Sequence, residues 1–404
     1  MSASEVVEVE GHIIDSLILA KVLDVIVDSG ADYRMVDVEI GRTNVDASHA
    51  RIELTAPDEA SLAALLAELQ IHGANVVAQV DVSTEPAPVD GVLPAGFYAT
   101  TNLPTQVRSG GQWVDVDNPE MDCALVVRPD GRTRTAPMHR VKAGDPVVVG
   151  GGGVRVRPIG KPRGASPFEF MSSDVSSEKP KEQLVTRVAA RIKAAKAAGG
   201  RVLAVCGPAV VHTGAGPAVA ALVRAGIVDV LFAGNGFATH DIESNVLGTS
   251  LGVPLGNDVA PEGSHANHLR VINEVRRRGS IAAAVDDGYV TGGVMYECVR
   301  HGVPFVLGGS VRDDGPLPDV FTDVVEAADA MRAELAGVAV ALMLASTLHA
   351  IATGNVLPAG VETYCVDINQ AVVTKLADRG SHQALGIVTD VGLFLDTLAR
   401  HLLP

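Results

Sequence analysis

The sequence predicts an α/β protein: a carboxyl-terminal Rossmann-like parallel sheet, preceded by an amino-terminal ferredoxin-like α+β unit and a small β module. Three observations predict it. Arg201–Glu243 reads as strand, Gly-rich break, helix and strand; strands alternate with helices from Leu184 onward; and residues 4–82 follow the order βαββαβ. Alternation of this kind is typical of a doubly wound sheet, and the βαββαβ order is typical of a ferredoxin-like unit. The predicted domains are residues 1–90, 91–165 and 184–404.

The composition excludes several classes of protein. The chain has 404 residues, is 47% hydrophobic but only 3% aromatic, and carries a net charge of −16. Nucleic-acid binders carry basic faces, so we expect no nucleic-acid partner, and an anionic membrane surface is equally unsuitable. The four cysteines form no CxxC pair, which predicts neither a metal site nor a disulfide framework. An acidic start and a longest apolar run of only Val338–Ala345 predict a cytoplasmic protein.

The amino-terminal unit is predicted from alternating and helical spacings of apolar residues. The first helix ends at Gly30, and the second is opened by Asp58 and Glu59. The predicted elements are a strand over Val6–Ile13, a helix over Ser16–Asp28, strands over Met35–Gly41 and Ala50–Thr55, a helix over Pro57–Gln70 and a strand over Val76–Val82. This fold hosts many functions, so it does not by itself identify one.

The middle of the chain is rich in Gly and Pro. Thr84–Val92 is predicted to be a link, and residues 93–160, with short apolar runs such as CALVV, a compact all-β module. Pro167–Gln183 is polar and irregular, which indicates either a domain linker or a functional loop.

The carboxyl-terminal domain is predicted from runs that alternate between strand and helix character. Asn235–Glu243 is interpreted as a polar loop, and Val338–Ala345 as a strand or a buried helix. The other predicted helices are Leu184–Ala198, Ala218–Ala225, 265–278, 291–301, Asp323–Leu335 and Leu393–Leu403, and the other strands Val202–Val211, Val228–Ala233, 303–309, 362–368 and 384–390.

Small and polar residues follow each predicted strand of this domain. They are Cys206, Gly207, His212–Gly216, Gly234–Asp241, Gly308–Asp314, Ser346–His349, Asp367–Asn369 and Asp390–Gly392. Such an edge suits a dinucleotide, because glycines let backbone N–H groups approach the pyrophosphate and carboxylates bond ribose hydroxyls. The HTGAGPAV segment matches only part of GxGxxG/A, since Val219 takes the third position, and each loop alone is about equally well explained as a tight turn.

Several single residues allow a structural as well as a functional interpretation. His212, His240 and His349 each lie beside a strand end, where a histidine is either a hydrogen-bonding structural residue or a catalyst. His265 and His268 are expected to face solvent from a helix. Cys206 is either a nucleophile or, as we favour, a buried small residue, and Cys365 is expected in the core.

Eight motifs give the chain a resemblance to a known family. They are FYATTNLPTQV, NPEMDC, PMHRVKAGDPVVVG, FEFMSSDVSSEKP, GPAVVHTG, FAGNGFATHDIE, VLGGSVRDDGPLPD and YCVDINQAVVTKL. With these, the sequence resembles the LOR/SDH-region proteins, and within them the NAD-dependent archaeal-type ornithine cyclodeaminases and the carboxyl-terminal half of bifunctional arginine dihydrolase/ornithine cyclodeaminases. The resemblance spans nearly the whole chain.

The resemblance implies conversion of L-ornithine to L-proline and ammonia with catalytic NAD, and so a place in proline biosynthesis and in arginine and ornithine metabolism. It implies an NAD site at the strand ends described above. The implied NAD contacts are Asn235, Gly236, Asp314, Ser346, Thr347, Leu348, His349, Asp367, Asp390 and Val391.

The chemistry of ornithine selects further candidates in the β module. Glu120 or Asp122 is expected to hold the δ-ammonium, and Arg108 or Arg140 to pair with the carboxylate, although ordinary surface ion pairs explain these charges about equally well. Asn102, Thr105 and Gln106 are expected to add hydrogen bonds to the substrate. The base that deprotonates the amine is His240, Asp241 or Lys142, and the sequence does not rank the three.

Two other functions remain compatible with the sequence. One is another NAD-dependent amino-acid or opine-type dehydrogenase, which releases NADH; the other is a non-enzymatic amino-acid sensor. The many polar strand ends favour an enzyme, and a homo-oligomer is expected because symmetric assemblies are common.

Overall fold

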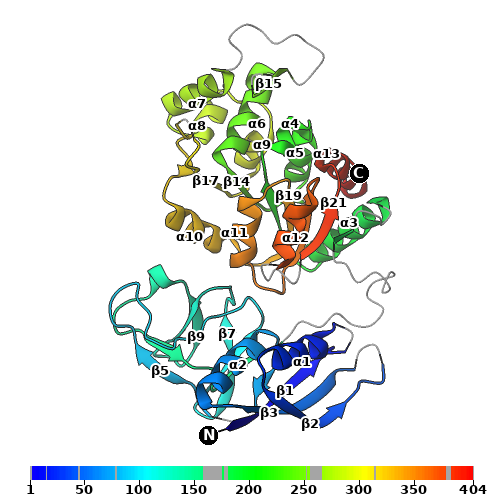
Figure 1. Ribbon diagram of the computed structural model, residues 1–404. Helices are drawn as coiled ribbons and strands as arrows, with labels where there is room; N and C mark the ends of the chain where they lie inside the picture. Colours follow the sequence, from blue (N-terminus) through cyan, green and yellow to red (C-terminus); the bar gives the residue numbers. More distant parts are fainter. Residues whose placement is uncertain are drawn as a thin grey trace. The chain divides into compact units, whose positions relative to one another are not determined.

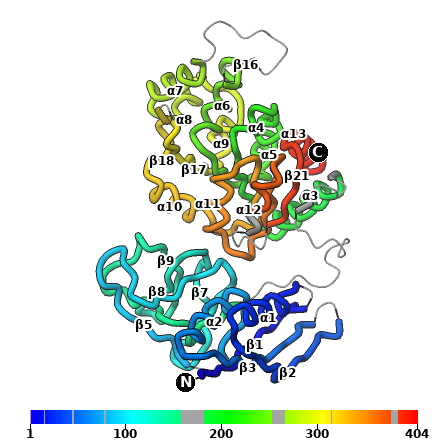
Figure 2. The backbone as a smooth tube through the Cα atoms, in the orientation of Figure 1, coloured from blue at the N-terminus to red at the C-terminus, as the bar shows by residue number. Residues whose placement is uncertain are grey.

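A computed structural model describes most of the chain and divides it into two compact units. The described residues are 2–14, 16–43, 46–77, 80–157, 175–176, 181–251, 253–254, 266–313, 315–378 and 384–403. One unit comprises Met1–Ser172 with Leu357–Gly360, and the other Ser173–Val356 with Val361–Pro404. Figures 1 and 2 show the path of the chain through each unit.

The first unit begins with the ferredoxin-like fold that the sequence predicts. Its elements are β1 (Ala3–Gly11), α1 (Ile18–Asp28), β2 (Asp32–Glu39), β3 (Ser48–Ala56), α2 (Glu59–Ile71) and β4 (Asn75–Val76). The strand order is β2-β3-β1-β4, with antiparallel pairs throughout. Both helices pack on one face, where Val22 and Ile26 of α1 and Leu69 of α2 share a core with Ile52 of β3. The last strand, predicted over Val76–Val82, is shorter than expected.

The β module of the same unit is a seven-stranded sheet in the described residues, with the order β11-β6-β7-β9-β8-β10-β5. Its elements are β5 (Ser83–Pro86), β6 (Thr105–Ser109), β7 (Gln112–Asp117), β8 (Ala124–Val127), β9 (Thr133–Ala136), the short 3-10 helix η1 (Met138–Arg140), β10 (Pro146–Val149) and β11 (Val154–Val156). The predicted link at Thr84–Val92 is wrong in its first residues, because Ser83–Pro86 pair with Pro146–Val149 as an edge strand.

The second unit contains the predicted Rossmann-like sheet. Its strands are β12 (Val175–Ser176), β13 (Arg201–Cys206), β14 (Val230–Gly234), β17 (Phe305–Gly308), β18 (Val320–Phe321), β19 (Val338–Leu344), β20 (Glu362–Asp367) and β21 (Ala384–Val388). They pair in parallel in the order β12-β21-β20-β19-β13-β14-β17-β18. Numbered along the chain from β13 and leaving out the terminal β12 and β18, the order is 3-2-1-4-5-6, the Rossmann arrangement. A short hairpin of β15 (Thr249–Ser250) and β16 (Val253–Pro254) lies outside this sheet.

Helices cover both faces of the parallel sheet. They are α3 (Lys181–Ala197), α4 (Ala209–His212), α5 (Gly216–Arg224), α6 (Asn235–Leu247), α7 (Asn267–Arg278), α8 (Ile281–Asp286), α9 (Val294–His301), α10 (Val324–Glu334), α11 (Leu348–Val356), α12 (Gln370–Asp378) and α13 (Val391–Leu402). The helices α3, α13, α5 and α9 pack in succession, and α10, α11 and α12 form a separate group (Figure 1). Among the described residues, no helix has the length and apolarity that crossing a membrane requires.

One local prediction needs correction, one ambiguity is resolved, and some helices were not predicted. Asn235–Glu243, interpreted as a polar loop, is the start of helix α6, because Phe237, Ala238 and Ile242 are all completely buried at helical spacing. The strand interpretation of Val338–Ala345 is the correct one, as β19 shows. Helices α4, α8, α11 and α12 were not predicted. Helix α8 is capped by Ser280, whose side chain accepts a hydrogen bond from the N–H of Ala283.

Candidate functional site

The switch point of the parallel sheet lies between β13 and β19. The chain leaves β13 toward β14 and β17, whereas it leaves β19 toward β20 and β21. Gly207 follows β13 and donates its N–H to the carbonyl of Leu344 at 2.9 Å, and a Cβ on Gly207 would stand 1.9 Å from the carbonyl oxygen of Ala345. Only glycine allows this backbone contact. Ligands of open α/β sheets bind at such a point, outside the carboxyl ends of the strands.

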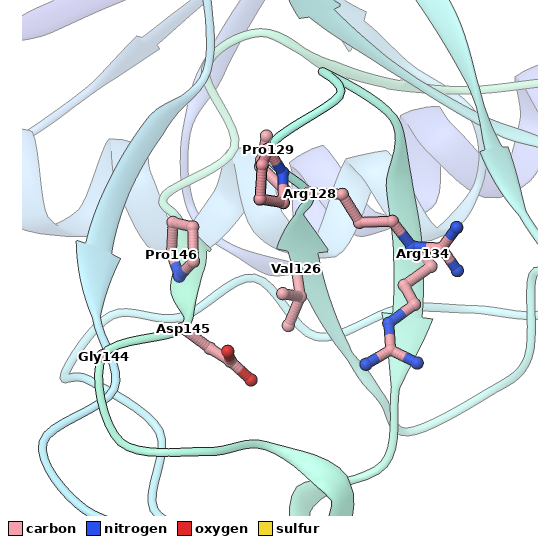
Figure 3. A pocket seen from close by; sticks show the side chains of 8 residues that line it. Val126, Arg128, Pro129, Arg134, Gly144, Asp145 and Pro146 are labelled. Atoms are coloured by element: carbon pink, nitrogen blue, oxygen red, sulfur yellow. The ribbon is translucent and has the colours of Figure 1, made fainter.

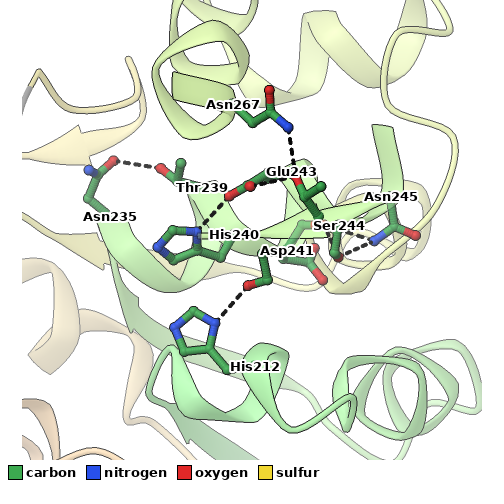
Figure 4. Close-up of polar contacts among 11 residues, drawn as sticks. His212, Asn235, Thr239, His240, Asp241, Glu243, Ser244, Asn245 and Asn267 are labelled. Carbon is green, nitrogen blue, oxygen red and sulfur yellow. Dashed lines mark hydrogen bonds and ion pairs between the residues drawn. The ribbon is translucent and has the colours of Figure 1, made fainter. Parts of the chain in front are cut away.

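The first turn of α6 holds two of the predicted NAD contacts. The Oδ1 atom of Asn235 accepts hydrogen bonds from the N–H of Leu317 at 3.0 Å and from Oγ1 of Thr239 at 3.4 Å (Figure 4). Gly236 lies where a Cβ would stand 3.4 Å from Cγ of Pro208. No side chain caps α6, so its first N–H groups remain available to an anion. The segment suits a pyrophosphate bound mainly by backbone.

His349, at the start of α11, packs against the ends of two other strands. A Cβ on Gly234 would stand 2.9 Å from its Cε1 atom, and a Cβ on Gly308 would stand 3.1 Å from its Nε2 atom. Burial lowers the pKa of His349 and outweighs the opposing effect of Asp313, so the imidazole is neutral at pH 7. Of the residues before it, Ser346 is buried, whereas Thr347 and Leu348 are exposed.

Two carboxylates lie at the ends of β20 and β21. Asp367 is buried and accepts the N–H of Asn369 at 2.7 Å, and Asp390 caps α13 by accepting the N–H of Leu393 at 2.9 Å. Val391 is buried directly after Asp390. The structure therefore brings every described residue of the predicted NAD site to the ends of β14, β19, β20 and β21, while Asp314 lies outside the described residues.

Large apolar side chains at this edge were not singled out from the sequence. Val311 is 110% exposed, Leu348 79%, Ile368 74% and Leu393 56%, and each follows a different strand of the parallel sheet. Apolar residues this exposed at a polar strand edge are the kind of surface that the flat rings of a ligand cover. The signal in the sequence was a single apolar residue inside each polar loop, such as the isoleucine of CVDIN.

Three histidines converge beside the first turns of α6. The rings of His212 on α4 and His240 on α6 have centroids 5.0 Å apart, and those of His240 and His268 on α7 are 6.3 Å apart. The Nδ1 atom of His240 contacts Oε2 of Glu243 at 2.8 Å (Figure 4), and Nδ1 of His212 contacts Oγ of Ser250 at 2.7 Å. Burial and the neighbouring His240 lower the pKa of His212.

The expectation that His268 faces solvent is wrong, because its Nδ1 atom is buried beside His240. His265 lies outside the described residues. The network continues from the carboxylate of Glu243, which accepts from Oγ1 of Thr249 at 2.7 Å, to Asn267, which donates to Thr249 at 2.9 Å. Within the described part of the chain, no group of His, Cys, Asp and Glu side chains has the arrangement of a metal site.

Asp241 caps helix α9. Its two carboxylate oxygens accept the N–H groups of Val294 at 2.9 Å and Met295 at 2.8 Å. Burial raises the pKa of Asp241 to about 6, although these two hydrogen bonds act in the opposite direction. Burial also raises the pKa of the Cys206 thiol, which keeps it protonated, so the structure supports the interpretation of Cys206 as a buried core residue. Cys365 is buried in the core, as predicted.

The predicted substrate residues of the β module all have partners within the first unit. Asn102 donates to the carbonyl of Leu357 at 3.3 Å, and Thr105 donates to the carbonyl of Leu103 at 2.9 Å. Gln106 donates to Asp115 at 2.6 Å. These bonds fix the orientation of each of the three side chains.

The charged candidates differ in exposure. Arg108 pairs with Asp81 at 2.7 Å, and Lys142 pairs with Asp90 at 3.0 Å. Glu120 is buried, whereas Asp122 is exposed and has a φ of 61°. Asp122 is the carboxylate that the structure leaves open to solvent.

An open depression in the β module contains none of these candidates. Its volume is about 640 Å³, and it is lined by Val126, Val127, Arg128, Pro129, Arg134, Gly144, Asp145 and Pro146 (Figure 3). Its wall combines two guanidinium groups with two prolines. No residue predicted to bind substrate or cofactor lines it.

Comparison with known families matches almost the whole chain. Residues 186–398 match the C-terminal Rossmann fold of arginine dihydrolase ArgZ-like proteins, residues 104–185 match the first region of the same C-terminal part, and residues 4–103 match the LOR/SDH bifunctional enzyme conserved region. The ornithine cyclodeaminase of Methanocaldococcus jannaschii is 53% identical over 98% of this chain and 95% of its own length.

Two solved structures are similar to the chain. The apo structure of ArgZ, a cyanobacterial arginine dihydrolase, has a TM-score of 0.86 and 38% identity, and covers 99% of this chain and 58% of its own. The ternary complex of AgrE with ornithine and NAD+ has a TM-score of 0.54 and 42% identity, and covers 99% of this chain and 57% of its own. The family predicted from the eight motifs is confirmed: the chain belongs to the family that joins a LOR/SDH region to an ArgZ-like C-terminal Rossmann domain, together with the archaeal ornithine cyclodeaminases.

Proposed function

We propose that this protein is an ornithine cyclodeaminase, which converts L-ornithine to L-proline and ammonia with NAD as a catalytic cofactor. The observation that carries the proposal is the 3-2-1-4-5-6 sheet, whose strand ends gather the residues that the family resemblance assigns to NAD. Relatives that bear this name are 45–53% identical over 98% of the chain, and AgrE, which is 42% identical over 99% of the chain, has been solved in a ternary complex with ornithine and NAD+.

The strand ends suit NAD in three ways. The uncapped N–H groups of α6 at Asn235 and Gly236 hold the pyrophosphate, and Asp367 and Asp390 lie at strand ends where a carboxylate binds ribose hydroxyls. The exposed apolar side chains beside them cover the rings. Bound NAD supplies a hydride acceptor and donor that is restored in each turnover, since the hydride leaves the α-carbon of ornithine and returns to the same carbon after ring closure.

The protein must take a proton from the δ-ammonium so that this amine can close the ring. Of the three candidate bases, Asp241 accepts two backbone hydrogen bonds from the start of α9, and Lys142 forms an ion pair with Asp90. We assign the role to His240. Glu243 accepts the Nδ1–H of His240 and so leaves Nε2 as the basic atom. In this proposal Glu120 or Asp122 recognises the δ-ammonium and Arg108 or Arg140 recognises the carboxylate. Asn102, Thr105 and Gln106 add hydrogen bonds to the substrate.

A single incubation tests the reaction. The protein is given excess L-ornithine with the α-hydrogen replaced by deuterium, and NAD far below the ornithine concentration. We expect more moles of proline than of NAD, and one ammonia for each proline. The α-carbon of proline should retain the deuterium, and NADH should not accumulate. NADH formed in proportion to the ornithine consumed would instead identify a dehydrogenase. Binding of ornithine with no product would identify a sensor.

The assignment of the base has its own test. His240→Gln should lower kcat and remove the acid limb of the pH–rate profile while KM for ornithine changes little, because the variant binds substrate but cannot take the proton. His401→Gln, near the end of α13, is the matched control and should leave the profile unchanged. An unchanged pH profile in His240→Gln would remove His240 from this role.

The proposed reaction belongs to proline biosynthesis from ornithine. We propose a cytoplasmic location, which the four buried, unbridged cysteines support because thiols persist in a reducing compartment. We also propose that the protein acts as a homo-oligomer.

A further inference from the structure

An edge strand of the ferredoxin-like unit exposes a row of apolar side chains. In the sheet order, β2 is at the end and pairs only with β3 among the described strands (Figure 2). Seven of its eight residues are exposed, and Met35 is half-buried. The exposed fractions are 43% for Tyr33, 48% for Val36, 41% for Val38 and 57% for the following Ile40. A long apolar edge of this kind pairs with another strand unless Lys, Pro or a cover protects it, and β2 contains no Lys or Pro.

A bulge decides which side chains share a face of β2. Before the bulge, Met35 pairs with Ile52, whose side chain is buried under the helices; after it, Val38 pairs with Ala50, which is buried on the same face. The register shifts between Met35 and Asp37, so Val36 is the extra residue. Tyr33, Met35, Val38 and Ile40 therefore share the helix face, while Arg34, Asp37 and Glu39 share the opposite face.

We infer that β2 pairs with β2 of a second copy of this chain, antiparallel and about a two-fold axis between Val36 and Asp37. In this register Tyr33 stands opposite Ile40 of the second copy, and Met35 stands opposite Val38. Arg34 stands opposite Glu39. The two pairs on the helix face are therefore apolar, and Arg34 meets its opposite charge, Glu39, on the other face. At the axis, Val36 of each copy stands opposite Asp37 of the other. Without the bulge, the same register would set helix-face residues against open-face residues.

Charge complementarity selects this register over its neighbour. A shift by two residues keeps the faces matched and pairs Arg34 with Asp37, but it sets Asp32 against Glu39, two like charges directly opposite. The chosen register avoids this repulsion. The result is an isologous dimer in which two four-stranded sheets become one continuous sheet of eight strands.

Disulfide trapping tests the register directly. In antiparallel pairs, opposite Cα atoms are about 4.5–5.5 Å apart, within the range of a disulfide, whereas positions 33 and 40 of one strand are about 23 Å apart. The double variant Tyr33→Cys/Ile40→Cys should therefore form a covalent dimer under mild oxidation. The chain's own four cysteines are buried and contribute little background. The matched control Tyr33→Cys/Val38→Cys, two residues out of register, should cross-link far more slowly.

A second measurement does not depend on cysteine. Val38→Lys/Ile40→Lys should raise the dimer dissociation constant about tenfold or more in analytical ultracentrifugation, since the new ammonium groups would then stand against Met35 and Tyr33 of the second copy, and burying a charge against apolar residues is costly. Val89→Lys/Val92→Lys, two exposed valines in the β module, is the control and should leave association unchanged. The proposal is overturned if the wild-type chain is monomeric, if the lysine variant associates as the wild type does, or if both cysteine pairs cross-link equally. None of these outcomes depends on turnover of ornithine.

Discussion

His240 and Glu243 form a hydrogen-bonded pair inside helix α6, with 2.8 Å between Nδ1 and Oε2, and Glu243 is completely buried. The two residues are three apart and so lie on the same side of the helix. The other carboxylate oxygen of Glu243 accepts a hydrogen bond from Oγ1 of Thr249 at 2.7 Å. Burying a carboxylate is costly unless it is fully hydrogen-bonded. The hydrogen bond to His240 therefore stabilises the fold, in addition to orienting the imidazole.

Replacing Glu243 by Gln should show this dependence. The amide keeps the size of the side chain but loses charge-assisted hydrogen bonds, so we expect the free energy of unfolding to fall by about 1–3 kcal/mol. Chemical denaturation measures it. Glu68→Gln on the exposed side of α2 is the matched control, for which we expect a change within about 0.5 kcal/mol. Equal effects of the two substitutions would contradict the role of the buried network.

Asp241 should make stability depend on pH. Its pKa is raised from 3.8 to about 6 in the folded protein, so its contribution favours folding below pH 4 and is lost as the pH rises to about 6. A shift of this size corresponds to about 3 kcal/mol. We therefore expect the wild type to lose unfolding free energy relative to Asp241→Asn as the pH rises from 4 to 6. The exposed Asp396→Asn is the control, and a difference that stays constant with pH would disprove the assignment.

Asp367 should contribute to cofactor affinity. It is buried at the end of β20, on the strand-end edge where we propose that NAD binds, and its carboxylate can accept hydrogen bonds from ribose hydroxyls. Replacing it by Ala should weaken NAD binding about tenfold in calorimetric titration, through loss of a charge-assisted hydrogen bond of about 1.4 kcal/mol. Asp396→Ala, on the exposed side of α13, should bind NAD as the wild type does. Unaltered affinity in Asp367→Ala would place the ribose elsewhere.

Gly234 and His349 should be coupled by their contact. A Cβ on Gly234 would stand 2.9 Å from Cε1 of His349, so Gly234→Ala must displace the imidazole. We expect weaker NAD binding and a loss of about 1–3 kcal/mol of stability from overpacking. Gly360→Ala is the matched control, because a Cβ there meets nothing within 4 Å. If Gly234→Ala binds NAD normally, His349 does not shape the cofactor site.

The sequence was sufficient for properties that repeat along the chain. Alternating and helical spacings predicted the ferredoxin-like unit and the Rossmann-like sheet, because each strand or helix must bury one face whatever its neighbours are. Motifs that span nearly the whole chain identified the family. The polar residues at the strand ends were also visible, because parallel strands place their carboxyl ends on one edge.

Tertiary packing decided what single residues do. Asn235–Glu243 was interpreted as a loop because it is polar. It forms a helix because Phe237 and Ile242 are buried in the core, and its polar side chains then form hydrogen bonds with one another. The sequence left His240 and Asp241 equivalent as candidate bases. Adjacent residues on a helix point in directions about 100° apart, so one meets Glu243 and the other meets the start of α9, which comes more than fifty residues later in the chain.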